Sequence, residues 1–240
     1  MGIQSLTKKR LELEGVYNVR ELGGYPISVN AMTKWGVFLR SADLAEITEN
    51  DVNLLFDYGI RTIINLKESV DETYNPNNPI ESDIRFRHIH IPLFDDYEKM
   101  MDMAAEYNGS LYLATIKAFA PRIKDIFTSI AKHIDDGGIL FHCFAGKDRT
   151  GIIAMLLLLL VQVSKLDILA DYIVSAVYIR PLITKLNKSF EEIRIYPEEI
   201  ELIMAEITNN YDGVENYLKS IGISSEDIEK TKENFIFKNK

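Results

Sequence analysis

The sequence predicts an α/β fold in which a mainly parallel central sheet is flanked by helices. Short apolar or β-branched segments alternate with longer helical ones, as is typical of a sheet covered on both faces. The apolar run from Ile152 to Val163 is too short to span a bilayer, so it indicates a buried helix. Hydrophobic residues make up 47% of the 240 residues, which is enough for a sizeable core.

The first half of the chain shows where several elements start and stop. Thr48 is expected to cap a helix that ends at Gly59. Residues 15–30 are rich in glycine and turn formers, so we expect them to be irregular. Four short segments have the composition of strands, at 37–40, 62–66, 86–91 and 139–142.

Helices are expected to dominate the second half. A long one at 111–134 contains Pro121, which should kink or restart it. We expect one domain over residues 1–240, with a helical part from about 165 to 240. Further helices are expected at 98–107, 151–163, 166–178, 181–192, 197–209, 213–221 and 225–235.

Charge and cysteine content exclude several classes of protein. A formal net charge of -9 repels nucleic acid and anionic membranes, so an anionic substrate needs a local island of positive charge. Cys143 is the single cysteine, which excludes an internal disulfide and a cysteine-cluster zinc site. The N-terminal residues contain no apolar signal core, so we expect a cytoplasmic protein or one secreted without a recognisable signal peptide.

The candidate chemistry lies between the strand at 139–142 and the helix that follows it, where parallel sheets bind their ligands. A free thiol is mostly protonated at neutral pH, but a helix N-terminus and nearby Lys or Arg favour the thiolate. Cys143 is therefore the candidate nucleophile. His142 is expected to fix the loop through hydrogen bonds. The sequence of this loop, from residue 142 to 151, is HCFAGKDRTG.

Residues 144–149 have the composition of a phosphate cradle. Their amide groups can curl into an anion-binding nest, and Gly146 allows a positive φ at low cost. The guanidinium of Arg149 can bind two phosphoryl oxygens in the transition state. Thr150 could donate a hydrogen bond to the departing thiolate. We place the substrate contacts of this loop at Phe144, Ala145, Gly146, Lys147 and Thr150.

The pattern H-C-x5-R-T at residues 142–150 resembles the signature of cysteine-based protein tyrosine phosphatases. The whole loop is similar to that of the atypical bacterial branch, which acts on phosphotyrosine, phosphoserine, phosphothreonine and phosphoinositides. Residues 18–25 resemble its N-terminal N-x-R-D-L-G-G motif, and 38–42, 170–172 and 217–224 resemble further stretches. The resemblance implies a protein tyrosine phosphatase fold of the dual-specificity type with extra C-terminal helices.

The general acid has several candidates. The family often has Asp-Leu-Arg where this chain has Asn-Leu-Lys at 65–67, and asparagine cannot act as an acid. Asp148 beside the nucleophile is the favoured acid, and the alternative is a salt bridge that orders Lys147 or another basic side chain. Asp95 and Asp96 are alternative acids on a mobile loop, or else ordinary turn carboxylates.

Other basic side chains also have two interpretations. Arg20 and Arg40 are predicted to line the substrate pocket, with pairing to carboxylates as the alternative. Lys147 inside the cradle is expected to contact the substrate, with a solvated loop lysine as the alternative. Extra positive charge at this place resembles lipid phosphatases and would favour multiply phosphorylated headgroups. His88 and His90 alternate along a strand and make a weak metal site, so we expect no metal and no cofactor.

Together these residues predict a phosphomonoesterase that works through a phospho-cysteine intermediate. Phosphorylated proteins and phosphoinositides are both candidate substrates, while nucleic acid and stable membrane insertion are not expected. The alternative from another class is an inactive relic that binds phosphorylated partners, although such relics usually lack the cysteine or the arginine. A sulfur-transfer enzyme is remote, because the seven-residue span ending in Arg149 suits phosphate better. The oligomeric state stays open.

Overall fold

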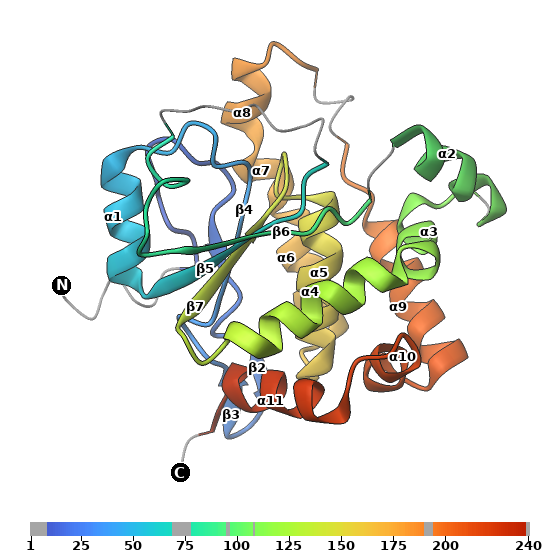
Figure 1. Cartoon of the computed structure of the whole chain (residues 1–240). Coiled ribbons are helices and arrows are strands. Elements are labelled where there is room, and N and C mark those ends of the chain that lie inside the picture. Colours follow the sequence, from blue (N-terminus) through green and yellow to red (C-terminus); the bar gives the residue numbers. More distant parts are fainter. Residues whose placement is uncertain (1–8, 69–77, 95–96, 108, 190–193, 239–240) are drawn as a thin grey trace.

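The computed structural model of the chain describes residues 9–68, 78–94, 97–107, 109–189 and 194–238. Its centre is a five-stranded sheet in the order β1-β4-β7-β5-β6 (Figure 1). The pairs β4–β7, β7–β5 and β5–β6 are parallel, whereas β1 runs antiparallel to β4. The mainly parallel sheet that the sequence predicts is therefore confirmed. The strand bounds are β1 Arg20–Glu21, β4 Phe38–Ser41, β5 Ile60–Asn65, β6 Arg87–His90 and β7 Gly138–His142.

Helices cover both faces of this sheet (Figure 1). On one face, α1 packs against β5 in a small core that contains Leu140. On the other face, α4 and α5 belong to a larger core that contains Ile139 and Phe141, because successive strand residues point to opposite faces. The helices are α1 Glu49–Tyr58, α2 Tyr97–Glu106, α3 Leu111–Ala118, α4 Ala120–His133, α5 Asp148–Leu160, α6 Lys165–Ile173, α7 Ser175–Tyr178, α8 Arg180–Lys185, α9 Pro197–Tyr211, α10 Val214–Ser220 and α11 Ser225–Phe235.

A second, three-stranded sheet has the order β2-β3-β8 and lies near the C-terminus in Figure 1. It joins β2 (Pro26–Ser28) and β3 (Ala31–Thr33) to β8 (Ile236–Lys238). The prediction that residues 15–30 are irregular is thus wrong for β1 and β2, and the helical C-terminal part ends in a strand. These strands are two or three residues long, and their pairing with distant segments is not encoded in local composition.

Two predicted helix boundaries are confirmed. The side chain of Thr48 caps α1, and Gly59 ends that helix with a φ of 107°. Pro121 lies in the first turn of α4. The long helix predicted at 111–134 is accordingly divided at Phe119 into α3 and α4.

Two other predicted helices are shorter than expected. The helix at 166–178 is divided into α6 and α7 at Val174. The β-branched Ile173 and Val174 lie at this break, and such side chains have a lowered helix propensity. The helix at 181–192 corresponds to α8, which ends at Lys185.

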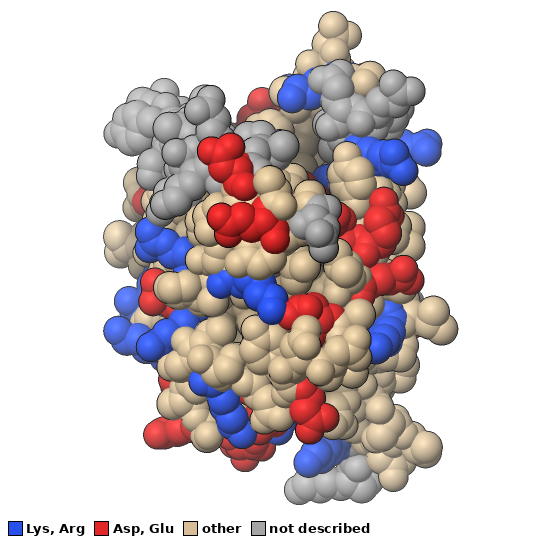
Figure 2. Space-filling model, turned by 90° about the vertical axis from the view of Figure 1, so that its right-hand side faces the viewer, with Lys and Arg blue, Asp and Glu red and all other residues tan. Residues whose placement is uncertain are grey.

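The surface mixes both signs of charge. In Figure 2, basic and acidic side chains are interspersed over the face that is turned to the viewer, so the acidic excess is not gathered there in a single patch. No helix in the described ranges combines the length and apolar character that crossing a bilayer requires.

Candidate active site

Cys143 lies at the carboxyl end of a central strand. It follows β7, which is paired in parallel with β4 and β5, and its side chain is buried at 2% exposure. Five residues later α5 begins at Asp148, and no side chain caps that end of the helix. The first amide groups of α5 and the positive end of its dipole therefore face the loop, which is the arrangement that binds anions.

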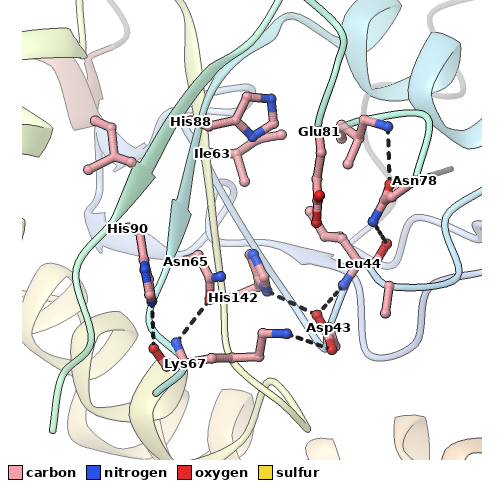
Figure 3. A pocket seen from close by; sticks show the side chains of 13 residues that line it. Asp43, Leu44, Ile63, Asn65, Lys67, Asn78, Glu81, His88, His90 and His142 are labelled. Carbon is pink, nitrogen blue, oxygen red and sulfur yellow. Dashed lines mark hydrogen bonds and ion pairs between the residues drawn. The ribbon is translucent and has the colours of Figure 1, made fainter. Parts of the chain in front are cut away.

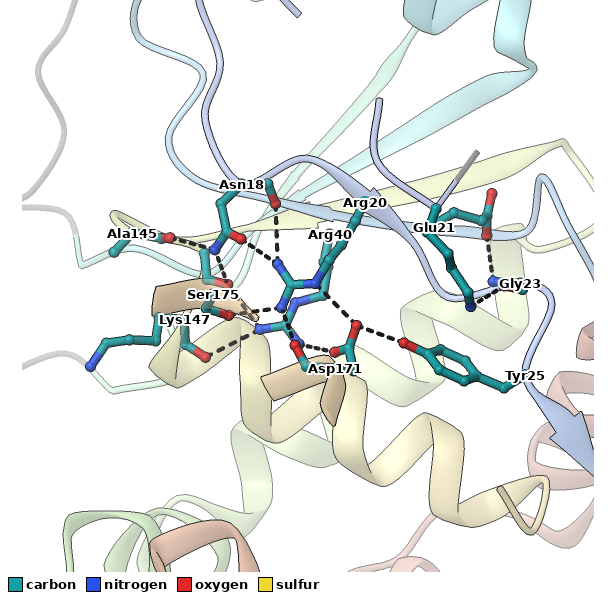
Figure 4. A network of polar contacts seen from close by, with 12 residues as sticks. Asn18, Arg20, Glu21, Gly23, Tyr25, Arg40, Ala145, Lys147, Asp171 and Ser175 are labelled. Atoms are coloured by element: carbon teal, nitrogen blue, oxygen red, sulfur yellow. Dashed lines mark hydrogen bonds and ion pairs between the residues drawn. The ribbon is translucent and has the colours of Figure 1, made fainter. Parts of the chain in front are cut away.

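The loop after Cys143 is held by its carbonyl oxygens. The amide of Asn18 donates from Nδ2 to the carbonyls of Ala145 and Gly146, at 2.9 and 3.1 Å (Figure 4). The guanidinium of Arg40 donates from Nη2 to the carbonyls of Gly146 and Lys147, at 2.9 and 3.3 Å. Three successive carbonyls are thus turned toward buried donors from the N-terminal part of the chain.

A fourth carbonyl, that of Phe144, accepts a hydrogen bond from the backbone N–H of Asp43 at 3.0 Å. In a trans peptide the C=O and N–H groups point in opposite directions. The amide groups of residues 145–148 therefore point away from the donors that hold these carbonyls. This orientation is the one that an anion-binding nest requires.

Gly146 cannot be replaced by a larger residue without moving the loop. Its φ is 65°, in the left-handed region that glycine adopts at low cost. A Cβ atom at this position would lie 2.4 Å from the carbonyl carbon and oxygen of Ser41. The close approach of the loop to β4 thus explains the glycine that the sequence singled out.

Asp171 on α6 binds both arginines beneath the loop (Figure 4). Its Oδ1 lies 3.0 Å from Nε of Arg20, and its Oδ2 lies 2.5 Å from Nη1 of Arg40. Burial alone would raise the pKa of Asp171, but the two guanidiniums lower it to about 2. Burial and the neighbouring Arg40 lower the pKa of Arg20 to about 10, so Arg20 stays charged at neutral pH.

The structure corrects the prediction that Arg20 and Arg40 line the substrate pocket. Arg20 is 2% exposed and Arg40 is 0% exposed. Both side chains lie under the loop and not in the cavity above it. The alternative interpretation, pairing with a carboxylate, is the one that the structure shows. Both arginines support the loop from below, Arg40 directly and Arg20 through Asp171 and Asn18.

A cavity of about 690 Å³ opens beside the loop and the start of α5. Arg149 lies half-buried in its wall, with the guanidinium carbon 4.9 Å from the centre of the Phe94 ring. The other lining residues combine aromatic side chains with both signs of charge. They include Glu68, Leu111, Tyr112, Phe144, Lys147, Asp148, Lys188, Arg194 and Tyr196.

Lys147 and Asp148 form the ion pair that the sequence offered as an alternative, with Nζ and Oδ1 2.9 Å apart. The ammonium also donates to the carbonyl of Arg194 at 2.7 Å. Oδ1 of Asp148 additionally accepts from the hydroxyl of Tyr112. The substrate contact of Lys147 and the acid role of Asp148 both stay predictions, since each side chain lines the cavity and also has a protein partner.

His142 lies behind the loop in a second cavity of about 220 Å³ (Figure 3). Burial lowers the pKa of His142 to about 3, so the imidazole is neutral, and its Nδ1 lies 3.9 Å from Oδ1 of Asp43. Asp43 also pairs with Lys67 at 2.9 Å. His88 and His90 line this cavity. Within the described ranges, no group of His, Cys, Asp and Glu side chains could hold a metal ion.

The remaining predicted residues have mixed outcomes. Thr150 is buried, and its Oγ1 has no hydrogen-bond partner in the described part of the chain, so a thiolate could accept its proton. Asp95 and Asp96 lie outside the described residues. Sequence reasoning assigned no role to Asp171 or Tyr112. Only Asp171 carried a signal, because it falls in a stretch that resembles the family.

Comparisons with known proteins identify the family of this chain. The profile of the tyrosine phosphatase family matches residues 11–237. A tyrosine-protein phosphatase of Nostoc commune is 33% identical over 215 residues, which cover 81% of this chain and 72% of that protein. The crystal structure of TpbA from P. aeruginosa in complex with pTyr is 16% identical, covers 76% of this chain and 94% of its own, and has a TM-score of 0.38. By the family profile and the Nostoc relative, this chain belongs to the tyrosine phosphatase family and is a protein-tyrosine phosphatase.

Proposed function

We propose that this chain hydrolyses phosphotyrosine in two steps through a phospho-cysteine at Cys143. The observation that carries the proposal is the orientation of four successive loop carbonyls, from Phe144 to Lys147, which all point toward donors elsewhere in the protein. This orientation leaves the opposing amide groups for the phosphoryl oxygens. The uncapped start of α5 adds positive potential at the same place.

In the first step the thiolate of Cys143 attacks phosphorus, and the bond from phosphorus to the tyrosine oxygen breaks. Arg149 and the loop amides stabilise the charge on the equatorial oxygens. The carboxylic acid of Asp148 gives its proton to the leaving phenolate oxygen and becomes a carboxylate.

In the second step water attacks the phospho-cysteine, and the carboxylate of Asp148 takes the proton that water loses. The bond from phosphorus to sulfur breaks, which releases inorganic phosphate and returns the thiolate. The buried hydroxyl of Thr150 supports this second step, because it can donate a hydrogen bond to the departing sulfur.

A wider substrate range is part of the same proposal. The resemblance to the atypical bacterial branch suggests phosphoserine, phosphothreonine and phosphoinositides as further substrates. Lys188 and Arg194 support it, because they line the same cavity as Arg149 and could bind additional phosphates. Steady-state rates on phosphotyrosine peptides and phosphoinositides measure this range directly. No turnover of the lipids would restrict the proposal to phosphotyrosine.

The deciding experiment compares the wild-type protein with Cys143→Ser on para-nitrophenyl phosphate. We expect the variant to lose about 10⁴-fold or more of the rate, since the nucleophile is removed. It should keep its affinity for inorganic phosphate, because the loop amides and Arg149 are unchanged. A fully active variant would refute the proposal. A wild-type protein that binds phosphate but releases no nitrophenol would instead favour a binding module.

A further inference from the structure

Tyr112 places a hydroxyl against the proposed acid. It lies at the start of α3, it is 5% exposed, and its hydroxyl donates to Oδ1 of Asp148. Burial, followed by the charge of Asp148, raises the pKa of Tyr112 well above 10. The phenol therefore keeps its proton throughout the neutral range and acts as a permanent donor.

The hydroxyl of Tyr112 and the ammonium of Lys147 both approach the same oxygen of Asp148. The hydroxyl of Tyr112 and Nζ of Lys147 both reach Oδ1, the latter at 2.9 Å. In the described part of the chain, Oδ2 takes no hydrogen bond. A carboxylic acid carries its proton on one oxygen, and an oxygen that already accepts a hydrogen bond and is paired with an ammonium is the less favourable place for it.

We propose that Tyr112 is a positioning residue that, together with Lys147, makes Oδ2 of Asp148 the oxygen that carries the acid proton. This inference rests on the proposed function, in which Asp148 protonates the leaving group. Without Tyr112, the side chain of Asp148 can rotate about its Cβ–Cγ bond, and the two oxygens can exchange places. The proton is then correctly placed in only a fraction of the molecules.

A second tyrosine extends this hydrogen bond into a chain. The hydroxyls of Tyr112 and Tyr172 lie 2.8 Å apart, and the backbone N–H of Tyr196 donates to the hydroxyl of Tyr172 at 3.2 Å. Each hydroxyl has one proton to give. Since Tyr112 gives its proton to Asp148, Tyr172 gives its own to Tyr112. The chain of donors thus runs from Tyr196 through both phenols to the carboxylate, and each bond polarises the next.

The test is Tyr112→Phe, assayed on a phosphotyrosine peptide and on para-nitrophenyl phosphate. Tyrosine leaves with a pKa of about 10, so its departure needs the acid, whereas nitrophenolate is a better leaving group and needs less help. We expect kcat on the peptide to fall by about 10-fold with KM unchanged, and kcat on the aryl phosphate to stay within about 2-fold.

The matched control is Tyr217→Phe. Tyr217 on α10 is also a buried tyrosine. Its hydroxyl donates at 2.7 Å to the carbonyl of Ile116 on α3, the helix that carries Tyr112. The control removes a comparable hydrogen bond without touching Asp148, so the ratio of the two kcat values should not change. Tyr172→Phe removes the donor to Tyr112 and the acceptor of the Tyr196 N–H, while the hydrogen bond from Tyr112 to Asp148 stays possible. It should lower kcat on the peptide in the same direction but by less.

A double-mutant cycle separates positioning from folding. In an Asp148→Asn background, Tyr112→Phe should cause no further loss, because the residue through which it acts is gone. Equal losses on both substrates, wild-type rates on both, or the same loss in the Asp148→Asn background would each overturn the inference. None of these outcomes contradicts the proposed phosphatase activity. That proposal fails instead if Cys143→Ser is fully active or if the wild-type protein is inactive.

Discussion

The two sides of the catalytic loop use the same residue type for different purposes. On the buried side, Arg20 and Arg40 share one carboxylate, and Arg40 also binds the loop carbonyls. On the open side, Arg149 is half-buried and lies over the ring of Phe94 in the wall of the cavity. The arginines below the loop hold its carbonyls and their supporting carboxylate, and the arginine above it is the one that the proposed mechanism assigns to the phosphoryl oxygens. The comparison shows that the burial and the partners of each arginine distinguish these two positions, whereas the residue type is the same.

The largest expected effect comes from breaking the buried ion pairs of Asp171. Asp171→Asn leaves two buried guanidiniums without their counter-charge, and loss of one partner of a buried ion pair typically costs about 3–5 kcal/mol. The free energy of unfolding, measured by urea denaturation, should fall by that amount. The control is Asp125→Asn, because Asp125 forms a surface pair with Arg122 and should matter by less than about 1 kcal/mol. Equal stability of both variants would show that the buried pairs do not hold the loop.

Lysine substitutions on the two sides sharpen the contrast. Arg149→Lys removes the fork that, in the proposed mechanism, binds two phosphoryl oxygens, so kcat on para-nitrophenyl phosphate should fall by about 10²- to 10³-fold. Its melting temperature should stay close to that of the wild type. Arg40→Lys should lower the melting temperature, because a single ammonium cannot reach Asp171 and two carbonyls at once. The opposite pattern, with Arg149→Lys destabilised and Arg40→Lys stable, would contradict the assignment of the two sides.

A smaller effect follows from pH. The pKa of Asp171 is lowered to about 2 in the folded protein, against about 3.9 for an aspartate in an unfolded chain. A folded pKa below the unfolded one gives stability that is fully present above about pH 5 and is lost as the pH falls toward 2. The amount is about 2.5 kcal/mol. The difference in unfolding free energy between the wild type and Asp171→Asn should therefore shrink between pH 5 and pH 2. A difference that is constant over this range would mean that Asp171 titrates normally.

Much of the fold could be predicted because its signals are local. Thr48 and Gly59 carry the start and end of α1 in their own chemistry, and Pro121 carries the break between α3 and α4. The short strands could not be predicted in this way. β8 exists because it pairs with β3, more than 200 residues earlier in the chain, so no property of its own three residues announces it.

The candidate site divides along the same line. The place of the loop from His142 to Gly151, between β7 and α5, could be predicted because its residues are contiguous in the sequence. The roles of Arg20 and Arg40 could not, since an arginine reveals its burial only when its partner is known. That partner, Asp171, is 131 residues from Arg40. Tyr112 was missed for the same reason, because a tyrosine at the start of a helix is ordinary until its hydroxyl meets a carboxylate.

The ion pairs beneath the loop also bear on how the enzyme is made. A chain leaves the ribosome N-terminus first, so the string HCFAGKDRTG is synthesised before α6 and Asp171. Until that aspartate arrives, Arg20 and Arg40 lack the counter-charge that lets them be buried, and Arg40 is not yet fixed against the carbonyls of Gly146 and Lys147. We expect the loop after Cys143 to take its final shape only when α6 has docked, so an incomplete chain would carry the signature of the family without its activity.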